Sequence, residues 1–185
     1  MKNISALLLF GILTFGLFGL NSCQKDDDDM GGDNEQEVIT TVQLEFTPAG
    51  GGSPVTFVFS DNDGPGGQDP VKDQIALTAG ATYELKVEFI DRSNPADPEF
   101  ITEEVQDEAE EHLVCYAITG GVLTATAKDQ DVNGKPLGLI ADVQAGAAGA
   151  GTLTISLKHM PSKDAATPCN TGDTDVEAEF AVVVN

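Results

Sequence analysis

Two histidines and the acids around them are the side chains of this sequence best suited to hold a transition-metal ion. His112 directly follows an acidic run, and His159 stands further along the chain. Imidazole nitrogen combined with carboxylate oxygen is a ligand set that zinc and related ions prefer. We expect His112 and His159, with Glu108 or Glu110, to form such a set. The alternative is two surface histidines that pair with neighbouring acids.

A second candidate cation site is the stretch DQDVNG, residues 129–134. Asp129, Asp131 and Asn133 alternate and a glycine follows, as in the first half of a calcium loop, where alternate oxygens converge on a hard cation. The bidentate glutamate expected at the twelfth position is missing, because Ile140 stands there. The alternative is a hairpin turn, in which Asp, Asn and Gly are common for conformational reasons.

A third set of acids lies in the stretch DNDGPGGQDP, residues 61–70. Asp61, Asp63 and Asp69 could gather around calcium or another ligand, and the glycines between them let the backbone bend. Long loops on a rigid scaffold are common recognition elements. The alternative is a plain connecting loop.

Catalytic groups are harder to assemble from this sequence. It has no G-x-S-x-G motif around a serine and no phosphate-binding glycine motif ahead of a helical pattern. Carboxylate pairs could perform acid–base chemistry, but such pairs occur throughout a chain this acidic. Because no motif joins a nucleophile to a base, we expect a protein that is not an enzyme.

The overall charge narrows the range of partners. The 185-residue chain has a formal net charge of −22, so we expect no binding to nucleic acid, whose phosphates would be repelled. The acid excess favours solubility and cation binding. The chain has no Trp, and aromatic residues make up 6% of it, which argues against a carbohydrate-binding face built from stacked rings.

The elements that must position these side chains have the pattern of β-strands. Apolar and polar residues alternate in short runs that glycine, proline, asparagine and aspartate separate. We expect strands at residues 38–48, 54–60, 74–79, 82–91, 112–119, 122–129, 137–144, 151–159 and 176–184. Short strands, regular turns and no long helical pattern predict an all-β fold, an antiparallel β-sandwich with immunoglobulin-like topology.

Two connections between these strands carry their own predictions. Gly120 and Gly121 stand between two strand patterns and predict a hairpin. Residues 100–105 are expected to form an edge strand and residues 106–111 an acidic turn, because like charges at helical spacing oppose helix formation.

The N-terminal residues predict where the protein is located in the cell rather than part of its fold. Lys2 precedes an uncharged apolar run over residues 4–20, which is the pattern of a secretory signal. The stretch LNSC, residues 20–23, resembles the lipobox of bacterial lipoproteins, in which the signal is cut before a cysteine that is then acylated. The resemblance implies a signal peptide at residues 1–22 and membrane attachment through a lipid on Cys23.

The residues after Cys23 carry a second signal. Lys25 and the four aspartates that follow it resemble the export signal of Bacteroidota surface lipoproteins, which directs transfer to the outer leaflet of the outer membrane; the four are Asp26, Asp27, Asp28 and Asp29. A solvated linker is the alternative, since like charges repel, and both can hold. We expect an acidic tether at residues 23–37 and one β-sandwich domain at residues 38–185, exposed at the cell surface.

The two remaining cysteines have several options in an exported protein. Cys115 and Cys169 could form a disulfide, remain free or bind a metal. Cys115 lies between apolar neighbours, so a buried inert thiol is a further alternative. The spacing of His112 and Cys115 places them on opposite faces of a strand, which argues against one metal shared by both.

Most of the body resembles a group of small Bacteroidota lipoproteins, through stretches such as DGPGG, TYELKVEF, NGKPLGL and GTLTISLKH. Such proteins often carry a label that invokes a type 1 periplasmic binding fold, but that two-lobed α/β fold needs alternating strands and helices over a longer chain. The resemblance implies a surface lipoprotein of a kind often associated with TonB-dependent outer-membrane receptors.

These observations together predict a non-enzymatic surface lipoprotein that captures a small ligand or a cation for an outer-membrane receptor. Calcium and zinc are the cations that the candidate sites would suit. The alternative function is a structural or adhesive module that calcium stiffens and whose partner is a protein or a polymer.

Overall fold

The computed structural model describes residues 37–64 and 66–185, all of which belong to one compact unit. The predicted signal peptide, Cys23, Lys25 and residues 26–29 lie outside the described residues, and the lipid anchor and export signal therefore stay predictions. Within the described part, no helix is both long enough and apolar enough to cross a membrane.

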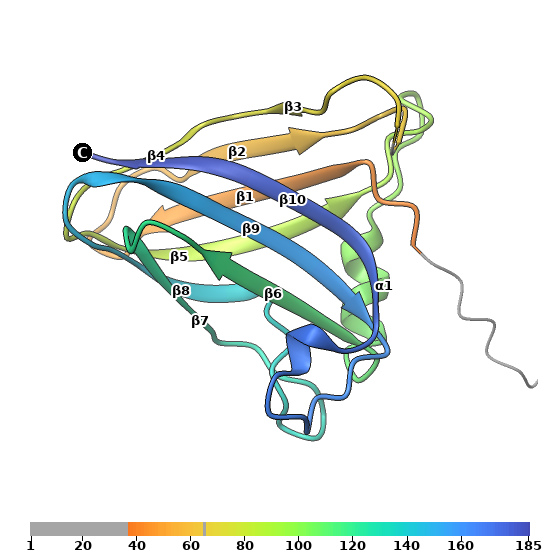
Figure 1. Ribbon diagram of the computed structural model, residues 1–185. Helices are drawn as coiled ribbons and strands as arrows, with labels where there is room; N and C mark the ends of the chain where they lie inside the picture. Colours follow the sequence, from red (N-terminus) through yellow and green to blue (C-terminus); the bar gives the residue numbers. More distant parts are fainter. Residues whose placement is uncertain (1–36, 65) are drawn as a thin grey trace, which may run out of the picture. The chain divides into compact units, whose positions relative to one another are not determined.

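A six-stranded antiparallel sheet forms one layer of the fold (Figure 1). Its order is β3-β2-β1-β5-β8-β7. Short runs of alternating apolar and polar residues form its strands, which are β1 (Thr41–Pro48), β2 (Val55–Ser60), β3 (Val71–Lys72), β5 (Thr82–Ile90), β7 (Leu123–Ala127) and β8 (Ile140–Ala145).

A four-stranded sheet forms the other layer, with the order β4-β10-β9-β6. Its strands are β4 (Ile75–Leu77), β6 (His112–Ile118), β9 (Gly149–His159) and β10 (Asp173–Val184). The pair of β4 and β10 is parallel, whereas β9 pairs antiparallel with both β10 and β6. The sandwich is therefore antiparallel apart from one short edge strand.

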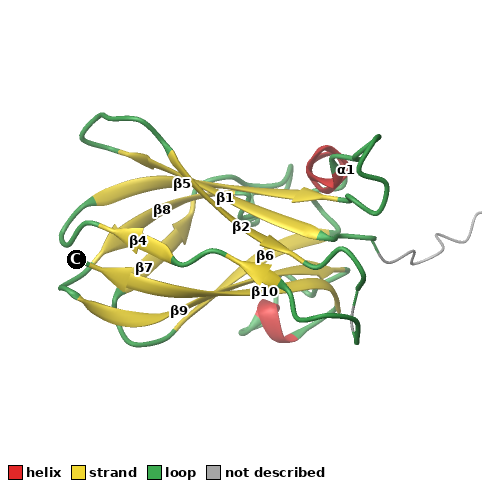
Figure 2. Cartoon of the chain, turned by 90° about the horizontal axis from the view of Figure 1, so that it is seen from above, coloured by secondary structure: helices red, strands yellow, loops and turns green. Residues whose placement is uncertain are grey.

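The apolar core fills the space between the two layers, which Figure 2 shows from above. Alternation along each strand supplies it: Leu85, Val87 and Phe89 of β5 are buried, while Lys86 and Glu88 between them point outward. Burial of each such side chain contributes about 1.5–3 kcal/mol. The predicted all-β sandwich is confirmed.

The hairpin predicted at Gly120 and Gly121 is wrong. The strand before these glycines, β6, pairs with β9, and the strand after them, β7, pairs with β8 in the other sheet. The glycines, both with positive φ, therefore turn the chain from one layer to the other. A Cβ on Gly120 would lie 2.4 Å from the carbonyl oxygen of Ala150, so close approach to β9 also requires glycine there.

The edge strand predicted at residues 100–105 is also wrong, because this stretch forms helix α1 (Ile101–Asp107). Ile101 and Val105, one helical turn apart, are buried against the core. Thr102 fixes the helix to β5, since its Oγ1 accepts a hydrogen bond from the Phe89 N–H at 2.7 Å and donates to the Phe89 carbonyl at 3.1 Å. Packing thus overcomes the repulsion among the acids.

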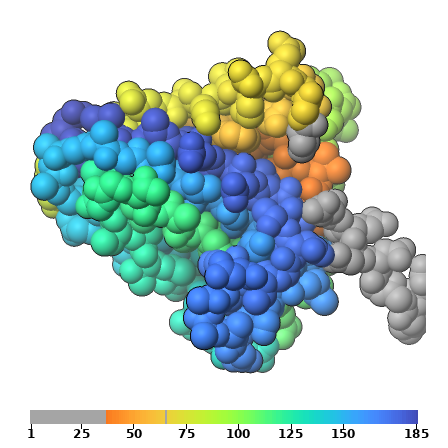
Figure 3. Space-filling model, viewed as in Figure 1, coloured from red at the N-terminus to blue at the C-terminus, as the bar shows by residue number. Residues whose placement is uncertain are grey.

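A disulfide joins Cys115 of β6 to Cys169 in a short 3-10 turn, Pro168–Asn170. This bond settles the alternatives for the two cysteines: neither is a free thiol or a metal ligand. It fastens the loop of residues 160–172, which connects β9 to β10 and forms the blue lobe at the bottom of Figure 3. His159 ends β9 directly before this loop, and Asp175 lies in β10, three residues after it.

Candidate metal centre

His112 and His159 lie side by side because of the pairing of β6 with β9. The two residues are direct partners in the antiparallel register. Their imidazole rings stack with centroids 4.8 Å apart and planes 13° from parallel. Direct cross-strand partners have their side chains on the same face of the sheet, so two histidines far apart in the sequence meet here.

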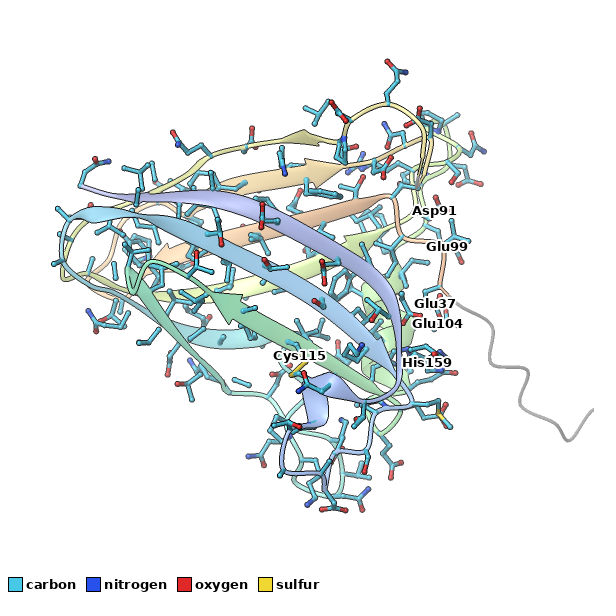
Figure 4. The ribbon with its side chains drawn as sticks, in the orientation of Figure 1. Glu37, Asp91, Glu99, Glu104, Cys115 and His159 are labelled. Carbon is cyan, nitrogen blue, oxygen red and sulfur yellow. A yellow bond between two sulfur atoms is a disulfide. The ribbon has the colours of Figure 1, made fainter. Side chains whose placement is uncertain are left out.

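Both histidines occupy positions where the alternation of the strands requires a buried side chain. His112 precedes inward-facing Val114, and His159 follows inward-facing Leu157, with the same period of two. His112 is 0% exposed and His159 is 6% exposed. The pair is therefore part of the inner layer, and His112 lies beside Glu108 at the C-terminal end of α1. Figure 4 shows His159 at the same end of the sandwich as Glu104.

A β-bulge brings Asp175 to the same place. In the pairing of β10 with β9, Thr174 is opposite Lys158 and Val176 is opposite Leu157, so Asp175 is an extra residue without a partner position. Such a residue escapes strict alternation and can be aimed at a site. One ligand atom each from His112, His159 and Asp175 lies within 4.8 Å of the others. We call these three residues the histidine site.

The hydrogen bonds around the imidazoles leave one nitrogen of each ring without a partner. Nδ1 of His112 lies 3.2 Å from the carbonyl oxygen of Glu108, which can only accept, so this nitrogen carries the proton. Nε2 of His159 faces the carboxylate of Glu111 at 4.0 Å. The remaining nitrogens, Nε2 of His112 and Nδ1 of His159, are buried and make no hydrogen bond within the described residues.

The carboxylate of Asp175 also has no hydrogen-bond partner among the described residues. Both of its oxygens are buried and accept no hydrogen bond from the described residues. Burial raises the pKa of this carboxyl, against the opposing effect of the His159 and His112 imidazoles. Buried polar atoms in proteins are almost always paired, so these four atoms are candidates to bind a ligand.

The spacing of these atoms is close to that of metal ligands. Two ligand atoms on one tetrahedral zinc are roughly 3.3 Å apart, from bond lengths near 2.05 Å. From the 4.8 Å limit on the histidine site, metal binding would require the side chains to move closer and the two stacked rings, now 13° from parallel, to turn toward one ion. A histidine that binds a metal normally donates its other N–H to a carbonyl or a carboxylate, as His112 does to Glu108.

Two further carboxylates lie close to His112. Ligand atoms of Glu37, Glu108 and His112 also lie within 4.8 Å of one another. Burial raises the pKa of Glu37, and the nearby charges of Glu104, Asp175 and Glu108 add to the effect. Figure 4 shows Glu37, Glu104 and His159 gathered at one end of the sandwich. A divalent cation there would relieve the repulsion among these acids.

The acids of the predicted calcium loop are bound by other groups. Asp131 is buried, and its Oδ1 accepts the backbone N–H groups of Asn133 and Lys135 at 2.9 Å each. Its Oδ2 contacts the Lys163 ammonium at 3.0 Å. Asp129 accepts the N–H groups of Gly138 and Leu139 at 2.8 and 2.9 Å. These oxygens stabilise a turn.

Lys163 takes the position that a cation would have in this loop. Its ammonium donates to the carbonyl oxygens of Ala109 and Pro136 at 2.6 and 3.1 Å, in addition to its bond with Asp131. Asn133, the third predicted ligand, donates from its side-chain amide to Glu110 at 2.6 Å. The geometry does not favour calcium here, and calcium binding stays a prediction.

The acids of the third stretch line a shallow hollow and make no compact ligand group. Asp61, Asp63 and Asp69 border a hollow of about 270 Å³. Oδ2 of Asp63 accepts the backbone N–H of Gln68 at 2.9 Å, as expected of an Asp in a turn. Among the residues that the structure describes, groups of three potential metal ligands occur only around His112.

Comparisons with known proteins give no independent guide to this site: no protein-family model matches the chain, and neither the curated proteins nor the solved structures contain a match.

Sequence reasoning singled out His112, His159 and Glu108 but missed Asp175 and Glu37. Asp175 lies in a bulge that strand periodicity does not reveal. Glu37 lies just before the first strand, where nothing in the sequence links it to His112. A signal for Asp175 does exist, because DTDVEAEF has an acidic residue directly before an alternating apolar run.

Proposed function

We propose that this chain is a non-enzymatic, membrane-anchored surface protein that binds a divalent transition-metal ion at the histidine site. One observation carries the proposal: three residues with ligand atoms within 4.8 Å of one another, His112, His159 and Asp175, also have one imidazole nitrogen each and both carboxylate oxygens buried without hydrogen-bond partners in the described structure. Leaving such groups unpaired costs about 1–3 kcal/mol each, and a bound ion would remove that cost.

The chemistry of the ligands favours zinc over calcium. Calcium takes six to eight oxygen ligands, whereas the histidine site offers two nitrogens and one carboxylate. Zinc, copper(II) and nickel(II) accept imidazole readily. A carboxylate of Glu37 or Glu108, or a water molecule, would complete the coordination. We name zinc as the reference ion for the test.

The location and the role of the protein rest on its sequence. The lipobox-like stretch that ends at Cys23, and Lys25 with the aspartates after it, support a lipid anchor and export to the cell surface. The absence of a nucleophile motif in the sequence supports binding rather than catalysis. A surface protein that holds a metal ion would suit a role in delivering that ion to a TonB-dependent outer-membrane receptor.

We do not propose the calcium-stiffened adhesive module. That alternative needs a calcium site, and in the better-matched candidate loop the side chains of Asp129, Asp131 and Asn133 bind backbone amides, Lys163 and Glu110.

Titration of the purified full chain, kept in mild detergent and first treated with chelator, tests the metal site. We expect calorimetry to show one zinc ion per chain, and zinc at a hundredfold excess over its dissociation constant to stabilise the fold by about 2.7 kcal/mol. Asp175→Asn should weaken zinc binding at least about tenfold, by loss of a charged ligand. The control is Asp107→Asn, since Asp107 is an exposed acid of α1.

A wild-type chain without stoichiometric zinc binding would refute the metal site. Equal zinc affinities of Asp175→Asn and Asp107→Asn would instead show that the ion binds at another set of acids. His159→Phe keeps a flat buried ring and removes one ligand atom, so a folded His159→Phe protein with unchanged zinc affinity would also contradict the proposal.

A further inference from the structure

Strand β7 is an edge of the six-stranded sheet, and among the described residues no strand pairs with its free side (Figure 1). Just after β7, the Lys128 N–H donates to the Ile140 carbonyl at 2.8 Å. Along an antiparallel strand only every second residue bonds to a given neighbour, so the even-numbered residues of β7 bond to β8. The N–H and carbonyl groups of Leu123, Ala125 and Ala127 therefore point away from the sheet.

The other edges of the two sheets are short or covered. Strand β3 has two residues and β4 has three. On the free side of β6, the Val114 N–H donates to the Leu137 carbonyl at 2.7 Å, and the Tyr116 hydroxyl donates to the Gly138 carbonyl. Strand β7 has five residues in continuous register with β8, without a charge, a proline or a bulge. Proteins use such devices to keep an edge from pairing, so β7 is open to another strand.

The surface around β7 is uncharged, unlike most of the described chain. Residues 113–127 and 143–157 contain no Asp, Glu, Lys or Arg, although the chain has 31 acids and 9 bases. These two stretches form nearly all of β6, all of β7, most of β9 and the end of β8. Depletion of charge is typical of the central part of protein interfaces. Because the acids elsewhere repel a second copy, two copies approach at the lowest electrostatic cost on this side.

The sequence of β7 is complementary to a second copy of itself. In an antiparallel pair with its two-fold axis at Ala125, this residue faces its own copy and Leu123 faces the partner's Ala127. All three residues have their N–H and carbonyl groups on the free side, so each donates and accepts one hydrogen bond across the axis. Thr124 then lies opposite the partner's Thr126 on the exposed face of the sheet, and such pairs of threonines stabilise neighbouring strands.

We propose that β7 is the docking edge for a second copy of this chain, in a two-fold dimer whose two six-stranded sheets continue across the axis. The same patch of both copies forms the interface, as closed two-fold symmetry requires. The self-complementary pattern of β7 favours a second copy over a strand of another protein. This inference goes beyond the proposed metal site and does not depend on it.

Light scattering on the purified full chain in detergent measures the number of chains in each particle. We expect two chains at micromolar concentration. Thr126→Lys places a charge on the edge and should raise the dissociation constant of the dimer at least about tenfold. Thr56→Lys is the control, because it makes the same change at an exposed position of β2 in the same sheet, and it should leave the dimer unchanged.

Ala125→Pro tests the hydrogen bonds across the axis. The N–H that this variant loses points away from β8, and proline is tolerated in an edge strand where its missing N–H faces outward. We therefore expect a folded monomer with the circular dichroism spectrum of the wild-type chain.

A mixture of Thr124→Cys and Thr126→Cys chains tests the register. Directly opposite residues that are not hydrogen-bonded have Cα atoms about 4.5 Å apart, a distance that a disulfide spans. Mild oxidation should therefore cross-link the two variants to each other more than either variant to itself. Thr56→Cys in place of either variant should give no cross-link.

Each result can contradict the proposed dimer in its own way. A wild-type chain that stays monomeric overturns the proposal and leaves β7 for a strand of another protein. A dimer that is unchanged in both Thr126→Lys and Ala125→Pro uses another surface, which overturns the proposal too. Cross-linking of Thr124→Cys with Thr126→Cys that is no better than that of either variant with itself excludes a two-fold axis at Ala125. Zinc binding at the histidine site is measured separately by calorimetry and stands or falls without these results.

Discussion

The histidine site and the loop of residues 129–138 lie on two sides of the same connection between α1 and β6. Glu108 and Glu111 of that connection face His112 and His159. Ala109 and Glu110, which lie between them, bond to Lys163 and Asn133. Two polar clusters of similar composition thus share one short stretch of backbone, and they can be compared directly.

The two clusters differ in how far the protein satisfies its own polar atoms. In the loop, the carboxylates of Asp129 and Asp131 accept backbone N–H groups, and Lys163 supplies the positive charge. In the histidine site, the facing nitrogens and the oxygens of Asp175 have no such partners within the described residues. The unpaired state of buried donors and acceptors, rather than the number of acids, distinguishes the proposed metal site from the loop.

The disulfide fastens the loop that carries Lys163, and its loss should have the largest effect on stability. Cys115 and Cys169 are 54 residues apart in sequence, and closure of a loop of this length is worth about 4 kcal/mol in the chain-entropy description. We expect the chain with both Cys115→Ser and Cys169→Ser to lose about that much unfolding free energy in urea. A loss below about 1 kcal/mol would show that the loop of residues 160–172 is held by its other contacts.

Removal of the internal cation should damage the satisfied cluster and spare the histidine site. The side chains of Lys163 and Asp131 are 7% and 2% exposed, and breaking a buried pair of this kind costs about 3 kcal/mol. We expect Lys163→Met to lose about this much stability in urea, with unchanged zinc affinity. Lys72→Met, at an exposed position of β3, is the control. Equal loss of zinc affinity and stability in Lys163→Met would mean that the two clusters act as one.

At the histidine site, removal of a charged side chain should raise the stability of the metal-free protein instead of lowering it. Asp175→Asn removes a buried carboxylate that has no partner, and its amide N–H can donate to an unpaired imidazole nitrogen. We expect the metal-free variant to be more stable than the wild-type chain by about 1 kcal/mol, although it binds zinc less well. Urea unfolding in the presence of a chelator measures this difference. A less stable metal-free variant would show that Asp175 is already satisfied and that the site needs no ion.

The sequence predicts the layers of this fold better than its connections. Alternation marks the strands, because both layers bury one face of each strand. The same reasoning does not predict helix α1, since the stability of this helix comes from burial of Ile101 and Val105 rather than from its own charges. It also does not predict the course of the chain at Gly120 and Gly121, because the composition of a turn does not distinguish a hairpin from a connection between the two sheets.

The candidate site was predictable only in part, for a similar reason. The sequence shows that His112 and His159 are rare and have acids nearby. It cannot show that they are direct partners, because that depends on the register of β6 against β9, two strands far apart in the chain. Asp175 depends on a bulge of one residue in β10, and sequence periodicity assigns such a residue to the wrong face.

The two clusters should also respond differently to acid. Burial by itself would raise the pKa of Asp131, but hydrogen bonds from the Lys135 N–H and from Lys163 bring that pKa below its ordinary value of 3.8. A lowered pKa in the folded state gives stability that is present above pH 3.8 and is lost as the pH falls through the lowered pKa. Asp175, whose pKa burial raises, contributes with the opposite sign.

Unfolding of the wild-type chain and of Asp131→Asn across the acidic range measures this contribution. We expect the wild-type chain to be more stable near neutral pH, and the difference to shrink as the pH falls below 3.8. A difference that stays constant down to the lowest pH would mean that the side chain of Asp131 acts through its shape and not through its charge.

Calcium should have the smallest effect of all, because Lys163 already supplies the positive charge at Asp131. We expect millimolar calcium to shift the thermal midpoint of the full chain, held in detergent with no zinc present, by less than about 1 °C, which corresponds to a few tenths of a kcal/mol. Zinc under the same conditions should shift it by several degrees, because the histidine site lacks an internal cation. Asp131→Asn should leave the small calcium response as it is. A calcium shift as large as that of zinc, abolished in Asp131→Asn, would show that calcium displaces the Lys163 ammonium, and the contrast between a satisfied and an unsatisfied cluster would then fail.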